Sequence, residues 1–208
     1  IFNDNFPPIL DGVAVAAQNY AYWLHQKGYE SCVITPYAPG AEEVISAAPY
    51  PIYRYMSIPI PMRKPYRLGI PQIAFNFKQQ IKDIQFDLVH AHCPFTSGIL
   101  AKHIARKQHI PLVATFHSKY RQDFERAVPS KMIVDAEIKR IIKFYEQAHE
   151  VWIPQAAVEP TLREYGYKGH VEVVENGNDF ATPTGEIVSM RAFMRSQLML
   201  KPSEIMLL

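Results

Sequence analysis

Short runs of apolar, often β-branched residues alternate along the chain with longer stretches in which apolar residues recur every three or four positions. The short runs are typical of strands buried on both faces, and the longer stretches are typical of amphipathic helices. Strands that alternate with helices favour an α/β fold with a doubly wound, parallel, Rossmann-like sheet. The pattern predicts strands at 1–2, 31–35, 52–58, 87–91, 112–116, 151–153 and 171–174, and helices at 13–27, 72–84, 96–109, 131–148, 155–166 and 187–199.

One stretch interrupts this alternation, because residues 36–71 contain many of the chain's prolines. Proline lacks the N–H group that a helix interior needs, so this stretch cannot form a long helix. We expect an extended loop around the strand at 52–58.

The two ends of the chain are typical of interrupted strands. Ile1-Phe2 is typical of the end of one strand, and residues 204–208 are typical of the start of another. We therefore expect a fragment of a longer protein. Residues 1–177 would form a Rossmann-like domain, and residues 178–208 would form a connector and the first strand of a second domain.

The composition is that of a globular protein. Of 208 residues, 48% are hydrophobic, and 22 Lys and Arg against 20 Asp and Glu leave a net charge of +2. This balance gives no electrostatic reason to expect nucleic acid as a partner. Cys32 and Cys93 fall in apolar runs and are predicted to be buried, reduced thiols of a cytoplasmic protein. No apolar run reaches the roughly 18 residues of a membrane-spanning helix, and the first residues lack a signal-peptide pattern.

Open parallel sheets bind their ligands at the carboxyl ends of the strands, so functional residues are expected there. Gly12 and Val13 open the first helix, where free N–H groups and the helix dipole favour an anion such as phosphate. The sequence has no G-x-G-x-x-G motif and no P-loop motif there. Taken alone, Gly12 is typical of an ordinary turn glycine.

Histidines follow two predicted strands that are neighbours in the chain. Side chains alternate along a strand, so His90 and His92 should lie on one side, and His117 ends the next strand. His90 suits a hydrogen-bonded core position, whereas His92 and His117 have positions typical of substrate contacts rather than of the core. A zinc site is an alternative, but no acidic residue is spaced to activate a water molecule, so we predict no metal. Nucleophilic catalysis is not expected either, because no G-x-S-x-G motif is present and nothing near Cys93 would activate its thiolate.

These segments, taken in order, resemble family-four glycosyltransferases of the GT-B fold. Asn5-Phe6-Pro7-Pro8, Asp11-Gly12-Val13 and residues 24–36 resemble the opening of the N-terminal domain. Residues 87–95 and 110–120 resemble its middle, and the Asn-Gly-x-Asp turn at 176–179 resembles its end.

The resemblance implies an enzyme with two Rossmann-like domains that face each other across a cleft. A hexose passes from a nucleotide sugar to an acceptor hydroxyl, with retention at the anomeric carbon and without a required metal or other cofactor. Residues 1–177 would be the acceptor-binding domain. Most of the UDP- or GDP-hexose would bind a C-terminal domain absent from this chain, so the chain alone is expected to be inactive.

The resemblance also implies roles for particular residues. His117 would be the catalytic residue that hydrogen-bonds the transferred sugar. Family members often have Gly-Gly where this chain has Asp11-Gly12, and the second glycine, which approaches the phosphate, is kept. The implied donor-binding residues are Gly12, Val13, His92, Asn176 and Gly177, and the implied acceptor-binding residues are Phe6, Tyr120 and Arg121.

Within the family, residues 92–95 and 115–120 look most like the diacylglycerol glucosyltransferases, which glycosylate a lipid at the membrane surface. In residues 61–68, Arg63, Lys64 and Arg67 lie among apolar residues and are expected to contact anionic headgroups at the inner face of the membrane. The other interpretation of this segment, and of the charged stretch 119–126, is an ordinary solvated loop. Soluble sugars, inositol phosphate and growing polysaccharides stay open as acceptors.

Two other classes of protein fit a doubly wound fold. One is a non-catalytic sugar- or nucleotide-binding module that is complete at this length. The other is a flavodoxin-like or response-regulator domain, which would need a Ser/Thr-rich phosphate loop or an acidic pocket after the first strand, where Asp4 alone is little support.

Overall fold

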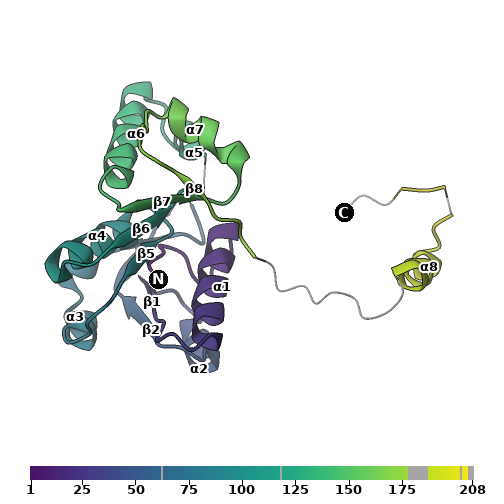
Figure 1. Ribbon diagram of the computed structural model, residues 1–208, viewed down its shortest axis with the longest axis horizontal. Coiled ribbons are helices and arrows are strands. Elements are labelled where there is room, and N and C mark those ends of the chain that lie inside the picture. Colours follow the sequence, from purple (N-terminus) through teal and green to yellow (C-terminus); the bar gives the residue numbers. More distant parts are fainter. Residues whose placement is uncertain (62, 118, 178–186, 202, 206–208) are drawn as a thin grey trace. The chain divides into compact units, whose positions relative to one another are not determined.

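The computed structural model describes residues 1–61, 63–117, 119–177, 187–201 and 203–205 (Figure 1). The chain forms two compact units, residues 1–177 and residues 178–208. The second unit contains the helix α8 (Ile187–Gln197), which confirms the helix predicted there. The strand expected at 204–208 lies mostly outside the described residues.

A parallel sheet runs through the first unit. Strand β1 pairs with β2, and β5, β6, β7 and β8 pair in chain order. Phe2 joins the two groups through parallel bridges to Ile34 and Ala91. The resulting order, β2-β1-Phe2-β5-β6-β7-β8, is Rossmann-like, and the winding changes direction beside Phe2. The strands are β1 (Val33–Pro36), β2 (Ile52–Tyr55), β5 (Val89–Ala91), β6 (Leu112–Thr115), β7 (Glu150–Ile153) and β8 (Glu172–Val173).

Helices cover both faces of this sheet. Helix α1 lies on one side, and α3 and α4 lie on the other (Figure 1). The helices are α1 (Gly12–Gln26), α2 (Ala41–Ala47), α3 (Phe75–Ile81), α4 (Thr96–Gln108), α5 (Tyr120–Ala127), α6 (Lys131–Tyr145) and α7 (Glu159–Glu164), with single 3-10 turns at Pro71–Ile73 and Ala156–Val158.

The ends of α1 follow from its sequence. Asp11 is the N-cap, and its carboxylate accepts a hydrogen bond from the N–H of Ala14. Gly28 follows the helix with a φ of +86°, a left-handed conformation that favours glycine. The predicted start and stop of this helix are both confirmed.

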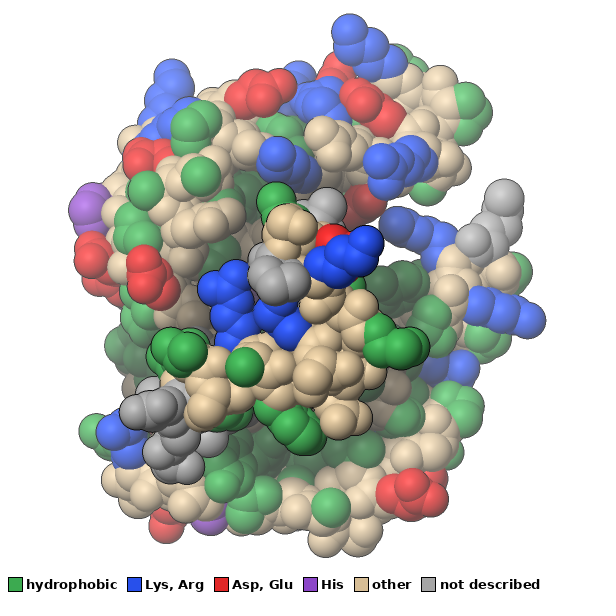
Figure 2. All heavy atoms as spheres, turned by 90° about the vertical axis from the view of Figure 1, so that its right-hand side faces the viewer, with side chains coloured by type: hydrophobic (Ala, Val, Ile, Leu, Met, Phe, Trp, Pro, Cys, Tyr) green, Lys and Arg blue, Asp and Glu red, His purple; other side chains and the backbone are tan. Residues whose placement is uncertain are grey.

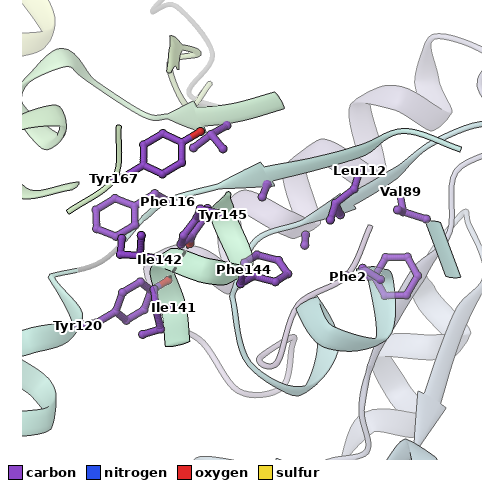
Figure 3. Packing of buried hydrophobic residues seen from close by; sticks show 14 of the residues in the cluster. Phe2, Val89, Leu112, Phe116, Tyr120, Ile141, Ile142, Phe144, Tyr145 and Tyr167 are labelled. Carbon is purple, nitrogen blue, oxygen red and sulfur yellow. Dashed lines mark hydrogen bonds between the residues drawn. The ribbon is translucent and has the colours of Figure 1, made fainter. Parts of the chain in front are cut away.

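The main core packs the sheet against α4 and α6 and is rich in aromatic residues. Phe116 lies edge-on to Tyr120 and Tyr145, with ring centroids 5.5 and 5.6 Å apart (Figure 3). A smaller core contains Phe6 together with alanines of α1 and residues of β1 and β2. Edge-to-face packing of this kind adds to the free energy gained from burying the rings.

At Gly98, helix α4 lies so close to the backbone of Cys93 that only glycine, which has no side chain, fits. A Cβ atom built there would lie 2.0 Å from the carbonyl oxygen of Cys93. We therefore expect Gly98→Ala to lower the free energy of unfolding by about 2 kcal/mol or more, measured by thermal or urea unfolding. Gly12→Ala is the matched control, because nothing lies within 4 Å of its Cβ position. Equal stability of the two variants would contradict this account.

The expectation of an extended loop over residues 36–71 is wrong at two places. Helix α2 forms after Gly40. Two acidic residues in its first turn stabilise it, because their negative charges lie near the positive end of the helix dipole. Further on, β3 (Ser57–Pro59) and β4 (Arg67–Gly69) form an antiparallel hairpin. The charged stretch 119–126 is also not a loop, because it largely coincides with α5.

The surface is mixed in charge. Lys and Arg side chains, Asp and Glu side chains and hydrophobic side chains are all exposed in the view of Figure 2. In the part of the chain that the structure describes, no helix is both long enough and apolar enough to cross a membrane.

Candidate functional site

A cavity of about 510 Å³ lies at the carboxyl ends of the central strands, where the winding of the sheet changes direction. The residues that follow Phe2 and β5 contribute to it, together with the first turn of α1, the β3–β4 hairpin, α4 and α5. We call it the strand-end cavity. Its lining includes Asp4, Asp11, Val13, His92, Cys93 and Tyr120.

The first turn of α1 reaches this cavity through Asp11 and Val13 and keeps free N–H donors there and at the adjacent Gly12. The N–H groups of Gly12 and Val13 have no hydrogen-bond partner among the described residues. The Asp11 carboxylate is engaged, since Oδ1 accepts from the N–H of Ala14 and Oδ2 accepts from Asn5 Nδ2, both at 2.7 Å. The turn therefore offers two donors to a phosphate, while Asp11 adds a negative charge that a Gly-Gly loop would lack.

The three histidines form a row of packed rings. The His90 and His92 centroids are 4.1 Å apart, and those of His92 and His117 are 5.2 Å apart. His90 Nε2 and Thr115 Oγ1 are hydrogen-bonded at 2.7 Å, and His92 Nδ1 and His117 Nε2 at 3.0 Å. The prediction that His90 and His92 share one side of the strand is confirmed, as is the core position of His90.

Burial differs along this row. His92 is fully buried, yet it is among the residues that line the strand-end cavity, and its Nε2 has no partner among the described residues. His117 is only partly buried. Burial lowers the pKa of His90 and His92 well below 6.5, and it lowers the pKa of His117 to about 4 although nearby Asp11 opposes the shift. All three rings are therefore neutral at physiological pH.

Asp4 lines the strand-end cavity and connects the segment after Phe2 to the residues that follow β5 and to the first turn of α4. Its position in the sequence alone gave little support for a functional role. Its Oδ1 accepts from the N–H and the hydroxyl of Ser97, at 2.9 and 3.2 Å. Its Oδ2 accepts from the Cys93 thiol at 2.7 Å. The N-cap residue of α4, Phe95, makes no side-chain capping bond, so Asp4 caps α4 from the segment that follows Phe2. An acidic residue directly after the first strand was the signal available in the sequence.

Two of the three predicted acceptor residues do not line the strand-end cavity. Tyr120 lines it. Phe6 is 1% exposed in the smaller core, with the Arg54 guanidinium 5.9 Å from its ring. Arg121 forms a 2.7 Å ion pair with Asp135. Phe6 and Arg121 therefore stabilise the fold, and spacing along the sequence did not reveal these partners.

The predicted turn at Asn176 and Gly177 is only partly visible. Both residues are exposed and follow β8 at the end of the first unit, and neither lines the strand-end cavity. Residues 178–179, which complete the motif, lie outside the described residues. A role near a hinge stays a prediction.

The predicted membrane cations lie in the β3–β4 hairpin. Arg63 and Lys64 are exposed in its connection. Ile58 and Leu68, which pair across the two strands, are 47% and 49% exposed. Arg67 differs, because it donates to Ser57 Oγ at 2.7 Å and to the Ser57 carbonyl at 3.0 Å. Arg67 therefore holds the hairpin together, and it also lines the strand-end cavity with Arg63 and Leu68.

No group of three or more His, Cys, Asp or Glu side chains in the described ranges is arranged to hold a metal ion. Both cysteines are free thiols. Cys93 is buried as predicted, whereas Cys32 is only partly buried, which corrects the sequence interpretation.

Comparison with known proteins gives a family match over most of the chain. The model of Glycosyltransferase Family 4 matches residues 10–181. An alpha-monoglucosyldiacylglycerol synthase of Streptococcus pneumoniae is 25% identical over 183 residues, which is 87% of this chain and 40% of that protein. The enzyme of the same name from Acholeplasma laidlawii is 29% identical over 133 residues, 64% of this chain and 32% of that protein. The chain thus spans less than half the length of these relatives.

Solved structures agree on the fold. The crystal structure of Anabaena HepE in complex with UDP-glucose superposes with a TM-score of 0.61 at 14% identity, over 94% of this chain and 48% of that one. The same protein with UDP and glucose gives the same TM-score. The fold is that of one Rossmann-like half of a GT-B protein, as the sequence predicted.

Proposed function

The chain belongs to glycosyltransferase family 4, and on this premise we propose that it is the acceptor-side half of an enzyme that transfers a hexose with retention from a nucleotide sugar to an acceptor hydroxyl. The observation that carries the proposal is the meeting of two features at one sheet edge. These are the free N–H groups that open α1 and the His92–His117 pair, whose rings are 5.2 Å apart.

The first feature suits the leaving group. When the bond to the sugar breaks, negative charge develops on the oxygens of the nucleoside diphosphate. The N–H groups of Gly12 and Val13 and the dipole of α1 would stabilise that charge, as the donors of an oxyanion hole do. The step needs no metal or other cofactor in this proposal. UDP-glucose, the ligand of HepE, favours a UDP-hexose, and a GDP-hexose is the alternative.

The second feature suits the sugar. His117 Nε2 is held by His92 Nδ1, which leaves His117 Nδ1 for a hydroxyl of the transferred hexose. A neutral ring in a fixed orientation positions the anomeric carbon for attack. His92 acts through His117 here, as a positioning residue, since it is itself fully buried.

The acceptor in this proposal is a lipid hydroxyl, on diacylglycerol or a glycolipid. Both named relatives are alpha-monoglucosyldiacylglycerol synthases. The β3–β4 hairpin would rest on the cytoplasmic face of the membrane, with Ile58 and Leu68 at the acyl boundary and Arg63 and Lys64 at anionic headgroups. Each such cation contributes roughly 1 kcal/mol of binding.

The test uses the full-length gene product. It is incubated with a panel of nucleotide sugars, with diacylglycerol vesicles in one arm and soluble sugars in the other, and products are identified by mass. We expect a hexose on the lipid. A product only in the soluble arm would keep the enzyme class and overturn the lipid acceptor. Binding of nucleotide sugar without any product would favour a non-catalytic binding module.

We expect the isolated 208-residue chain to transfer no sugar under the same conditions. Most of the nucleotide-sugar site would belong to a second domain, which this chain lacks in our proposal. Turnover by the isolated chain, measured with the same mass readout, would contradict that division of labour.

The hairpin gives a separate prediction about membrane binding. Replacing Arg63 and Lys64 together by alanine should weaken binding to phosphatidylglycerol vesicles by about 30-fold, because two cations at roughly 1 kcal/mol each are lost. Co-sedimentation at low salt measures the change. The matched control replaces Lys139 and Lys168, which are exposed elsewhere on the first unit. Equal loss in both double variants would mean that only net charge matters, and would overturn the role of the hairpin.

A further inference from the structure

A second cavity, of about 500 Å³, lies between α3 and α4. We call it the α3–α4 groove. The residues that α4 contributes are spaced three and four apart, so they form one stripe along the helix. The stripe consists of Thr96, Ile99, Leu100, His103, Ile104, Lys107 and Gln108, and α3 with its C-cap residue contributes Phe77, Lys78, Ile81 and Lys82.

The groove has an apolar floor and a basic rim. Phe77 and Ile104 are 3% and 7% exposed and belong to the main core, and partly buried apolar residues extend the floor. Lys78, Lys82 and Lys107 are exposed, and no Asp or Glu is among the described residues that line the groove. Lys82 also forms an exposed ion pair with Asp83 at 3.8 Å, so Lys78 and Lys107 carry most of the basic character of the rim. Such a surface fits an apolar chain whose surroundings carry negative charge.

The groove and the strand-end cavity share part of their lining at the start of α4. Thr96 and Ile99 line both. From Thr96 to Lys107 the stripe runs about 17 Å at the helical rise of about 1.5 Å per residue, which is comparable to the length of an acyl chain. A ligand that occupies both cavities would carry a polar end in one and a long apolar chain in the other.

We propose that the α3–α4 groove binds one acyl chain of a glycerolipid while the hydroxyl of that lipid lies in the strand-end cavity. The rim lysines contact anionic headgroups of the surrounding lipid. The proposal rests on the glycosyltransferase function proposed above and names the part of the lipid that this chain recognises. A helix of a protein partner would match the apolar floor, but it would not explain why the groove and the strand-end cavity share Thr96 and Ile99.

A groove-filling substitution tests the proposal in the full-length protein. His103 lies in the stripe, is exposed, and does not line the strand-end cavity. His103→Trp should raise KM for a long-chain diacylglycerol by about tenfold and leave KM for a short-chain diacylglycerol unchanged, because only the long chain needs the groove. His103→Ala, which removes the imidazole without filling the groove, is the control. Equal effects of His103→Trp on both acceptors would overturn the proposal.

Photolabelling separates this proposal from the proposed function. A diacylglycerol with a photoreactive group near the end of one acyl chain should label peptides of α3 and α4, and His103→Trp should reduce that labelling. Label on those peptides without glycosylation would keep the lipid site and overturn the enzymatic role. Glycosylation with label confined to other segments would keep the enzyme and overturn the acyl-chain site, leaving the groove to a protein partner.

Discussion

His117→Ala in the full-length protein is expected to lower kcat for hexose transfer by about 100-fold or more, which is typical for loss of one well-placed polar group at a reacting centre. His117 is the only partly exposed ring of the histidine row, and Asp11 at the mouth of α1 is close enough to affect its pKa. In the proposed function, the substitution removes the contact to the transferred sugar and leaves the free N–H groups of α1 in place. Nucleotide-sugar binding, measured by calorimetry, should change much less than kcat.

The control for this prediction is His117→Asn, which keeps a polar group of similar reach and should restore part of the lost rate. The pH profile gives an independent readout. The pKa of His117 is about 4, so protonation of this ring should reduce transfer only as the pH falls toward that value. A decline centred near 6.5 that disappears in His117→Asn would contradict a neutral, buried imidazole.

Periodicity predicted the sheet and most helices because the segments concerned are long or strongly patterned. Helix α6 is an example, since its buried residues Val134, Ile138, Ile141 and Ile142 follow a helical repeat. The same reasoning missed α2, which has seven residues and one buried side chain. It also missed the β3–β4 hairpin, whose strands have three residues each, too few to show an alternation.

The site was predictable where it depends on alternation along one strand, and unpredictable where it depends on a partner elsewhere. His90 and His92 had to share a side, and they do. The sequence could not show three pairings. Arg121 forms an ion pair with Asp135, and Arg67 donates a hydrogen bond to Ser57. The Arg54 guanidinium lies over the ring of Phe6. Such pairings are set by how helices and hairpins pack, and each one gives a predicted contact residue a partner within the fold.

The folded chain gives Asp4 a larger role than its position in the sequence indicated, and its replacement should affect stability strongly. Asp4→Ala leaves the Ser97 N–H and the Cys93 thiol without their acceptor and removes the cap of α4. We expect the free energy of unfolding to fall by about 2–3 kcal/mol, measured by urea unfolding at neutral pH. Asp4→Asn is the matched control, because its amide oxygen can still accept from the Ser97 N–H.

The same pair of variants gives a pH dependence whose sign can be worked out. Burial raises the pKa of Asp4 above 3.8 in the folded chain, so the folded state holds this proton more tightly than the unfolded state does. The contribution is therefore fully present below pH 3.8 and declines as the pH rises through the folded pKa. Asp4→Asn cannot ionise, so its free energy of unfolding should lack this decline. If the free energy of unfolding of Asp4→Asn still declines as the pH rises, the decline comes from another titrating group. Burial would then not destabilise the ionised Asp4 carboxylate.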